Sequence, residues 1–192
     1  GAGTQATNLS STSIRAVWPR AAVGGASNKT VHVIAVSDPD VNLKGFDGAM
    51  MYWRSTDGGY TWGIQDSLLP GIDTALFSGF GGDQYAIDAH DSIVAVAIFN
   101  DFEASFLLKS TDNGDTWTKT EFWTTGLIDY DPAAAGSVSD VNNDAVIDTL
   151  ESSDNSGDVI IDNNGLVHVF FGRQRYLDDD PVLDANFSYF PF

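Results

Sequence analysis

Short runs of β-branched and aromatic residues recur along the chain, and each run has the length of a β-strand. Gly, Asp and Asn stand at the ends of most runs. Apolar runs bounded by such turn-forming residues are typical of short antiparallel strands. The sequence therefore predicts an all-β fold, with strands at residues 20–23, 31–36, 49–53, 84–88, 93–98, 105–108, 158–162, 167–171 and 186–190.

One segment occurs twice, as Arg54–Trp62 and as Lys109–Trp117. Both copies follow the order basic-Ser-Thr-Asp-x-Gly-x-Thr-Trp, and they begin 55 residues apart. The same succession of predicted strands precedes each copy, and a third succession contains Asn163–Gly165, a strong hairpin signal. His32 and His168 occupy equivalent places in the second predicted strand of their units, which suggests a packing role for both.

The repeat divides the chain into blade-like units at about 14–66, 80–122 and 156–192, with an inserted loop at about 124–157. No further copy of the motif follows the last predicted strand, so we expect the third unit to be cut short. Four short antiparallel strands per unit at this spacing predict the blades of a β-propeller. About two and a half units cannot close a ring, so the expected propeller is incomplete. An ordinary β-sandwich with two similar hairpins is the alternative.

The repeated motif resembles the Asp-box, or BNR repeat, of sialidases and related β-propellers. In that family the motif forms the turn between the third and fourth strands of a blade. The resemblance implies a structural role for the repeated residues, and it implies that neither aspartate is catalytic. The residues concerned are Ser55, Asp57, Gly59, Trp62, Ser110, Asp112, Gly114 and Trp117.

These residue types suit a tight turn. An aspartate can accept hydrogen bonds from several backbone N–H groups, and glycine adopts a left-handed conformation that a Cβ disfavours. The tryptophan can pack its ring under the hairpin and fix its orientation. The motif is therefore informative about the fold and says little about activity, because propellers of this type include both enzymes and proteins without catalysis.

A catalytic site is not recognisable in the sequence. Sialidases of the resembled family bind the sugar carboxylate with three arginines, and an Arg-Ile-Pro motif supplies the first. Here the nearest segment is Trp18-Pro19-Arg20, in a different order, and Arg54 belongs to the first repeated motif. Arg173 and Arg175 share one strand face and would line a pocket or a solvated strand end. We therefore expect a structural or binding module, with part of a sialidase-like glycoside hydrolase as the alternative.

The composition limits the classes of molecule that the chain is expected to bind. The 192 residues carry a formal net charge of −18, and 24 of the acidic residues are aspartates that favour turns. Nine scattered Lys and Arg residues argue against binding to nucleic acid. The chain has no cysteine and no run of about 20 apolar residues that could span a membrane. We expect an exported bacterial protein, secreted or at the cell surface, whose partners are the remainder of the propeller or another chain, and a glycan or protein ligand.

The long connection contains a spacing of oxygen-bearing residues similar to a calcium loop. Positions 1, 3, 5, 9 and 12 of a twelve-residue EF-hand pattern would supply side chains, and position 7 would supply the backbone carbonyl of Val146. Ala145 stands where that pattern has a glycine, so we expect a single structural calcium loop and not a pair of EF-hands. A solvated acidic loop is the alternative. The expected ligands are Asp140, Asn142, Asp144, Val146, Asp148 and Glu151.

Overall fold

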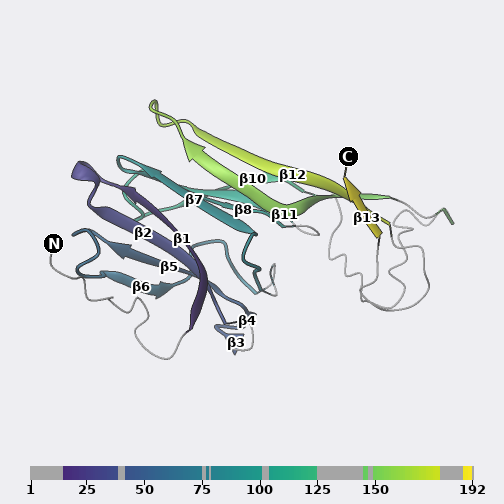
Figure 1. Ribbon diagram of the computed structural model, residues 1–192, viewed down its shortest axis with the longest axis horizontal. Helices are drawn as coiled ribbons and strands as arrows, with labels where there is room; N and C mark the ends of the chain where they lie inside the picture. Colours follow the sequence, from purple (N-terminus) through teal and green to yellow (C-terminus); the bar gives the residue numbers. More distant parts are fainter. Residues whose placement is uncertain are drawn as a thin grey trace.

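The structure is a computed structural model, and it describes residues 15–38, 42–74, 77, 79–100, 104–124, 145–146, 149–177 and 188–191. Within these ranges the regular elements are strands, apart from one short 3₁₀ turn, η1 (Ala26–Asn28). The expected all-β class is confirmed. Three antiparallel sheets, called sheets 1, 2 and 3 below, lie one after another through the molecule (Figure 1).

Two of these sheets have four strands in the order of the sequence. Sheet 1 contains β1 (Ala16–Gly24), β2 (Thr30–Ser37), β5 (Met50–Ser55) and β6 (Ile64–Ser67). Sheet 2 contains β7 (Tyr85–His90), β8 (Ile93–Ile98), β9 (Ser105–Ser110) and β10 (Thr118–Trp123). A small hairpin of β3 (Asn42–Leu43) and β4 (Phe46–Asp47) interrupts the connection from β2 to β5. The predicted four-stranded antiparallel units are therefore present twice.

The repeat extends to the register of the strands. In sheet 1, Val31 of β2 pairs with Ser55 of β5, and in sheet 2, Val94 of β8 pairs with Ser110 of β9. Ser55 and Ser110 are the second residues of the two repeated motifs and the last residues of β5 and β9. Each repeated turn therefore begins at the same position relative to its sheet. The two turns of the repeated motif are called the first and second repeat turns (residues 55–62 and 110–117).

Sheet 3 has three strands, β11 (Leu150–Ile161), β12 (Val167–Leu177) and β13 (Ser188–Pro191). β13 overlaps the strand predicted at 186–190. β11 begins well before the predicted start near residue 156, so residues 150–157 are strand and not part of the inserted loop. The pairing of β11 with β12 is irregular between Ser153 and Gly157. This polar, irregular stretch lacks the apolar alternation by which a strand is recognised in a sequence.

The three sheets pack through their faces, and their first strands lie close together. β7 contacts β1 on one side and β11 on the other. Along β8, alternate residues belong to two cores: Val96 packs into the core shared with sheet 1, whereas Ala95 and Ala97 pack into the core shared with sheet 3. The backbone N–H of Ile161 in β11 also donates to the carboxylate of Asp88 in β7 (2.7 Å).

The sheets do not close on one another, and no ring is formed by the described residues (Figure 1). In the same part of the chain, no helix is long and apolar enough to cross a membrane.

Candidate functional site

The two repeat turns have the same internal hydrogen bonds. In the first, Ser55 Oγ donates to Asp57 (2.7 Å) and accepts from the N–H of Gly59 (2.8 Å). In the second, Ser110 Oγ donates to Asp112 (2.7 Å) and accepts from the N–H of Gly114 (2.7 Å). The serine is buried in both turns, and its hydroxyl hydrogen-bonds to two other residues of the turn.

The aspartates of these turns are held in their ionised form. Asp57 accepts from both the N–H (2.9 Å) and the hydroxyl (2.6 Å) of Thr61, and Asp112 does the same with Thr116 at the same distances. Hydrogen bonds from the threonine hydroxyl, from its backbone N–H and from the serine lower the pKa of each aspartate from 3.8 to about 2. A carboxylate with so low a pKa cannot act as a general acid near neutral pH.

Glycine and tryptophan complete each turn. Gly59 (φ 92°) and Gly114 (φ 84°) both adopt the left-handed conformation expected from the motif. The ring of Trp62 lies below Gly59, and the ring of Trp117 lies below Gly114. Each turn also bonds to the hairpin of its own sheet, since the N–H of Gly58 donates to Lys29 O and that of Asn113 donates to Ser92 O (2.8 Å each).

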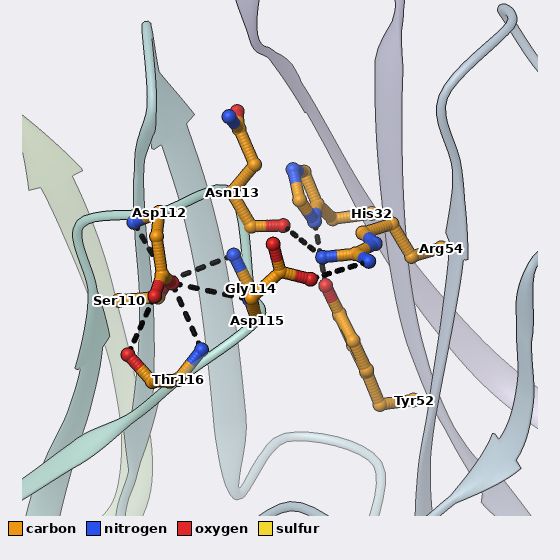
Figure 2. Close-up of polar contacts among 9 residues, drawn as sticks. All are labelled: His32, Tyr52, Arg54, Ser110, Asp112, Asn113, Gly114, Asp115 and Thr116. Atoms are coloured by element: carbon orange, nitrogen blue, oxygen red, sulfur yellow. Dashed lines mark hydrogen bonds and ion pairs between the residues drawn. The ribbon is translucent and has the colours of Figure 1, made fainter.

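The second repeat turn is also a contact between sheets 1 and 2 (Figure 2). Arg54 of β5 donates to the carbonyl of Asn113 (2.7 Å) and forms an ion pair with Asp115 (2.7 Å). Tyr52 of β5 lies against this turn, with its ring edge-on to Trp117 at 5.6 Å between centroids. The Arg54 side chain is therefore engaged by the second repeat turn.

A buried histidine supports the tyrosine. His32 Nδ1 and the hydroxyl of Tyr52 are 2.7 Å apart, and both side chains are buried. Burial, reinforced by the charge of Arg54, lowers the pKa of His32 to about 4, and burial raises the pKa of Tyr52. His32 therefore has the packing role expected for it. His168 differs, because it is exposed and lies 3.4 Å from the carboxylate of Asp162.

A polar cavity of about 380 Å³ lies where the first strands of the three sheets meet. Arg20 comes from β1, Asp83 precedes Tyr85 of β7, and Asp158 comes from β11. The Arg20 guanidinium donates to the carbonyl of Gly82 (3.1 Å) and pairs with Asp83 (3.3 Å). The remaining lining residues are Ala21, Tyr85, Ala86, Ile87, Ser156 and Gly157.

Sequence reasoning gave no role to this cavity. Arg20 was considered only because it follows Trp18 and Pro19 in a segment compared with the Arg-Ile-Pro motif. Asp83 and Asp158 belong to no motif in this aspartate-rich sequence. The residues come from strands more than 60 positions apart, and no local motif joins them. The available signal was their position in or beside the first predicted strand of each unit.

Arg173 and Arg175 do share one face of β12, but they pair with an acidic residue and line no described cavity. Both contact Glu151 of β11, Arg175 at 3.7 Å, and Arg173 also lies 4.4 Å from the ring centre of Trp123. Glu151 is the last residue of the expected calcium loop. In this structure the Glu151 carboxylate forms ion pairs with both guanidinium groups.

The rest of the expected calcium loop is only partly described. Asp140, Asn142, Asp144 and Asp148 lie outside the described residues. Ala145 has φ 67°, the left-handed conformation that the glycine of such a loop adopts, and Val146 is exposed. In the described part of the chain, no group of three or more acidic or histidine side chains is arranged to hold a metal ion.

No protein-family model and no curated protein match this chain. Among solved structures, it is similar to a crystal structure of a protein of unknown function from Dyadobacter fermentans DSM 18053. The sequence identity is 15% and the TM-score is 0.39, and the match covers 92% of this chain and 54% of the other. The chain thus spans about half the length of that protein.

Proposed function

We propose that the chain is an arc of an Asp-box β-propeller, exported from a bacterial cell, that serves as a structural or binding module and not as a catalyst. Two four-stranded sheets in sequential order, with identical turns after their third strands, support the propeller arrangement. The contacts of β7 with both β1 and β11 also support it, because first strands line the central axis of a propeller.

The outer face of sheet 3, which exposes two large apolar side chains, is the observation that carries this proposal. Val159 and Ile161 of β11 point to sheet 2 and are buried. Ile160 lies between them on the opposite face and is 49% exposed, and Phe170 of β12 is 57% exposed. Sheet 2 is covered on both faces, so the same construction would cover this face with a further sheet.

The aspartates of the turns support a structural role for these residues. The pKa of Asp57, of Asp112 and of Asp162 is lowered by hydrogen bonds within their turns. Backbone N–H groups of Leu166 and Asn164 lower the pKa of Asp162, as expected for a turn residue. A general acid needs the opposite shift, so these groups hold turns and do not transfer protons.

A first experiment measures the mass of the native polypeptide from its source under denaturing conditions. A mass well above 20.6 kDa supports an arc within a longer propeller. A mass equal to 20.6 kDa, together with a monomer in sedimentation velocity, contradicts the propeller proposal, because nothing would then cover sheet 3.

One observation favours a sialidase-like hydrolase as the second candidate, namely that Arg20 lies on the first strand and lines the cavity. The complete native protein should be assayed with a fluorogenic sialoside. We expect no turnover. Turnover that is lost in Arg20→Ala but kept in Arg15→Ala, a control just before β1, would contradict a non-catalytic role.

We also propose that the segment from Asp140 to Glu151 binds calcium and stabilises the connection to sheet 3. The spacing of its oxygen-bearing residues and the positive φ of Ala145 support this proposal. Millimolar calcium is expected to raise the melting temperature of the protein relative to EGTA, and Asp144→Asn should abolish the difference. Asp91→Asn, in the exposed turn between β7 and β8, is the control. An equal calcium effect in Asp144→Asn would contradict the site.

A further inference from the structure

A histidine side chain is completely buried where sheets 1 and 2 meet. His32 of β2 is 0% exposed, and its Nδ1 lies 2.7 Å from the hydroxyl of Tyr52 (Figure 2). Tyr52 is also buried, and its ring packs edge-on against Trp117 of the second repeat turn. The imidazole therefore supports the side chain through which sheet 1 contacts that turn.

The second ring nitrogen of His32, Nε2, is buried and has no hydrogen-bond partner among the described residues. A neutral imidazole has one N–H donor and one acceptor nitrogen, whereas a protonated imidazole has two donors. Protonation would therefore leave a charged Nε2–H buried without an acceptor, and the tyrosine hydroxyl could no longer donate to Nδ1. A buried donor without a partner is costly, and more so when it carries a charge. The observed geometry thus requires the neutral imidazole.

A guanidinium group on the neighbouring strand opposes a positive charge on His32. Arg54 of β5 stands directly opposite His32 in the strand register, so the two side chains lie on the same face of sheet 1. The Arg54 charge is paired with Asp115 (2.7 Å), which leaves that carboxylate engaged. Burial and the Arg54 charge together lower the pKa of His32 to about 4.

The other elements packed here supply no charge that would favour the protonated form. On β1 the residue opposite His32 is Ala22, and Arg20 on the same face is a cation with its own ion pair. Burial raises the pKa of Tyr85 in β7 to about 12, so its hydroxyl stays neutral. β8 faces this core with valine and isoleucine side chains. Asp112 of the second repeat turn is held by hydrogen bonds within its own turn.

We propose that His32 makes the contact between sheets 1 and 2 sensitive to acid. When the imidazole takes up a proton, Tyr52 loses its acceptor and Arg54 faces a second cation, so both side chains leave the second repeat turn. The opening is local and reversible, because the strand pairings within sheets 1 and 2 do not involve these side chains. This device is independent of the proposed function, since it concerns two sheets of the described chain and does not depend on a further sheet.

The same group makes stability depend on pH in a defined window. The pKa of His32 is 6.5 before folding and about 4 in the folded protein, so the unfolded chain takes up this proton first as the pH falls. The contribution of His32 is complete above about pH 6.5 and is lost as the pH falls towards 4. The equilibrium constant for unfolding should rise about 50-fold between pH 7 and pH 4.5 from this group alone. The aspartates of the repeat turns titrate below this window.

The test measures hydrogen–deuterium exchange of the complete native protein by mass spectrometry from about pH 7 to pH 3.5, corrected for intrinsic exchange rates. Below about pH 4 the amides of residues 110–117 should exchange about tenfold faster or more, while far-ultraviolet circular dichroism keeps its strand signal. Residues 55–62 are the internal control. The first repeat turn has the same internal hydrogen bonds and an aspartate of the same pKa, whereas the contacts of Tyr52 and Arg54 described above are made with the second.

Two variants separate the histidine from other acid effects. His32→Gln keeps a polar side chain that cannot be charged, and it should abolish the acid-dependent exchange and flatten the urea midpoint between pH 7 and pH 4.5. His168→Gln, at an exposed histidine of β12, is the matched control and should behave like the parent protein.

Nuclear magnetic resonance of protein labelled at histidine Cε1 tests the same group without relying on the fold of His32→Gln. The His32 signal should titrate near pH 4 in the parent protein. It should titrate at higher pH in Arg54→Gln, because the opposing charge is gone.

Four outcomes would overturn the proposal. These are a His32 signal that titrates near pH 6.5, acid-dependent exchange that persists in His32→Gln, equal acceleration of exchange in the two repeat turns, and loss of the strand signal at the same pH as the exchange. The last outcome would mean that the protein unfolds as a whole and that no local opening occurs.

Discussion

The buried hydroxyl of Ser110 makes three hydrogen bonds within one turn. It donates to Asp112 and accepts from the N–H groups of Asp112 (3.3 Å) and Gly114 (2.7 Å). Removing it leaves those N–H groups without their partner inside the turn. We predict that Ser110→Ala lowers the free energy of unfolding by about 1–3 kcal/mol. Urea denaturation measures this, with the exposed neighbour Thr111→Ala as the control. Equal midpoints for the two variants would contradict the prediction.

The carboxylates of Asp57 and Asp112 make stability depend on pH. Their pKa is about 2 in the folded protein and near 3.8 when unfolded, so the unfolded chain takes up protons first as the pH falls. Their contribution is therefore complete above about pH 4 and is lost as the pH falls towards 2. We predict that the urea midpoint declines in this window, and that the decline is shallower in Asp57→Asn/Asp112→Asn. Asp91→Asn should follow the parent protein, and a parallel decline in all three would count against this assignment.

At the level of the elements, a comparison of Gly58 with Gly114 distinguishes the cost of backbone strain from the cost of disturbing the contact between sheets 1 and 2. Both have positive φ, 81° and 84°, so alanine is strained at either position. A Cβ on Gly58 meets nothing within 4 Å, whereas a Cβ on Gly114 would overlap the hydroxyl of Tyr52. Tyr52 is held by His32, so the sheet contact and not the tyrosine alone would have to move.

We predict that Gly58→Ala destabilises the protein by about 1 kcal/mol, the usual cost of a strained alanine, and that Gly114→Ala costs clearly more. Urea denaturation of both variants provides the comparison. The colliding hydroxyl is absent from Tyr52→Phe. In that background, Gly114→Ala should lower the free energy of unfolding by less than it does in the parent protein. Equal losses in the two glycine variants would mean that the turn does not tie sheet 2 to sheet 1.

The strands differ in how far they could be predicted from the sequence. Strands such as β2 and β8 were recognisable because their residues are apolar on both faces, and the repeated motif aligned their registers. The polar start of β11 was not recognisable, because the sequence of Glu151–Asp154 alone is typical of a loop. Its strand conformation becomes evident only from its pairing with β12. The cavity was equally hidden, because Arg20, Asp83 and Asp158 become neighbours only when three first strands meet.

In the molecule as a whole, the face of sheet 3 that points away from sheet 2 is exposed. The exposed face carries Ile160 and Phe170, and Leu166 in the adjoining turn is also exposed. Apolar side chains grouped in this way favour association when nothing covers them. If the chain is part of a longer propeller, the same face becomes part of a core, where a charge would be costly.

We therefore predict opposite effects of Phe170→Glu in two proteins. In the 192-residue chain the variant should reduce concentration-dependent association in sedimentation velocity and leave the urea midpoint nearly unchanged. In the complete native polypeptide it should lower the unfolding free energy by several kcal/mol, about 3–5, as expected for a large core side chain. Tyr60→Glu, at an exposed ring far from this face, should be neutral in both. A neutral result for Phe170→Glu in the complete protein would contradict a further sheet on this face, because a buried charge without a partner cannot be accommodated at no cost.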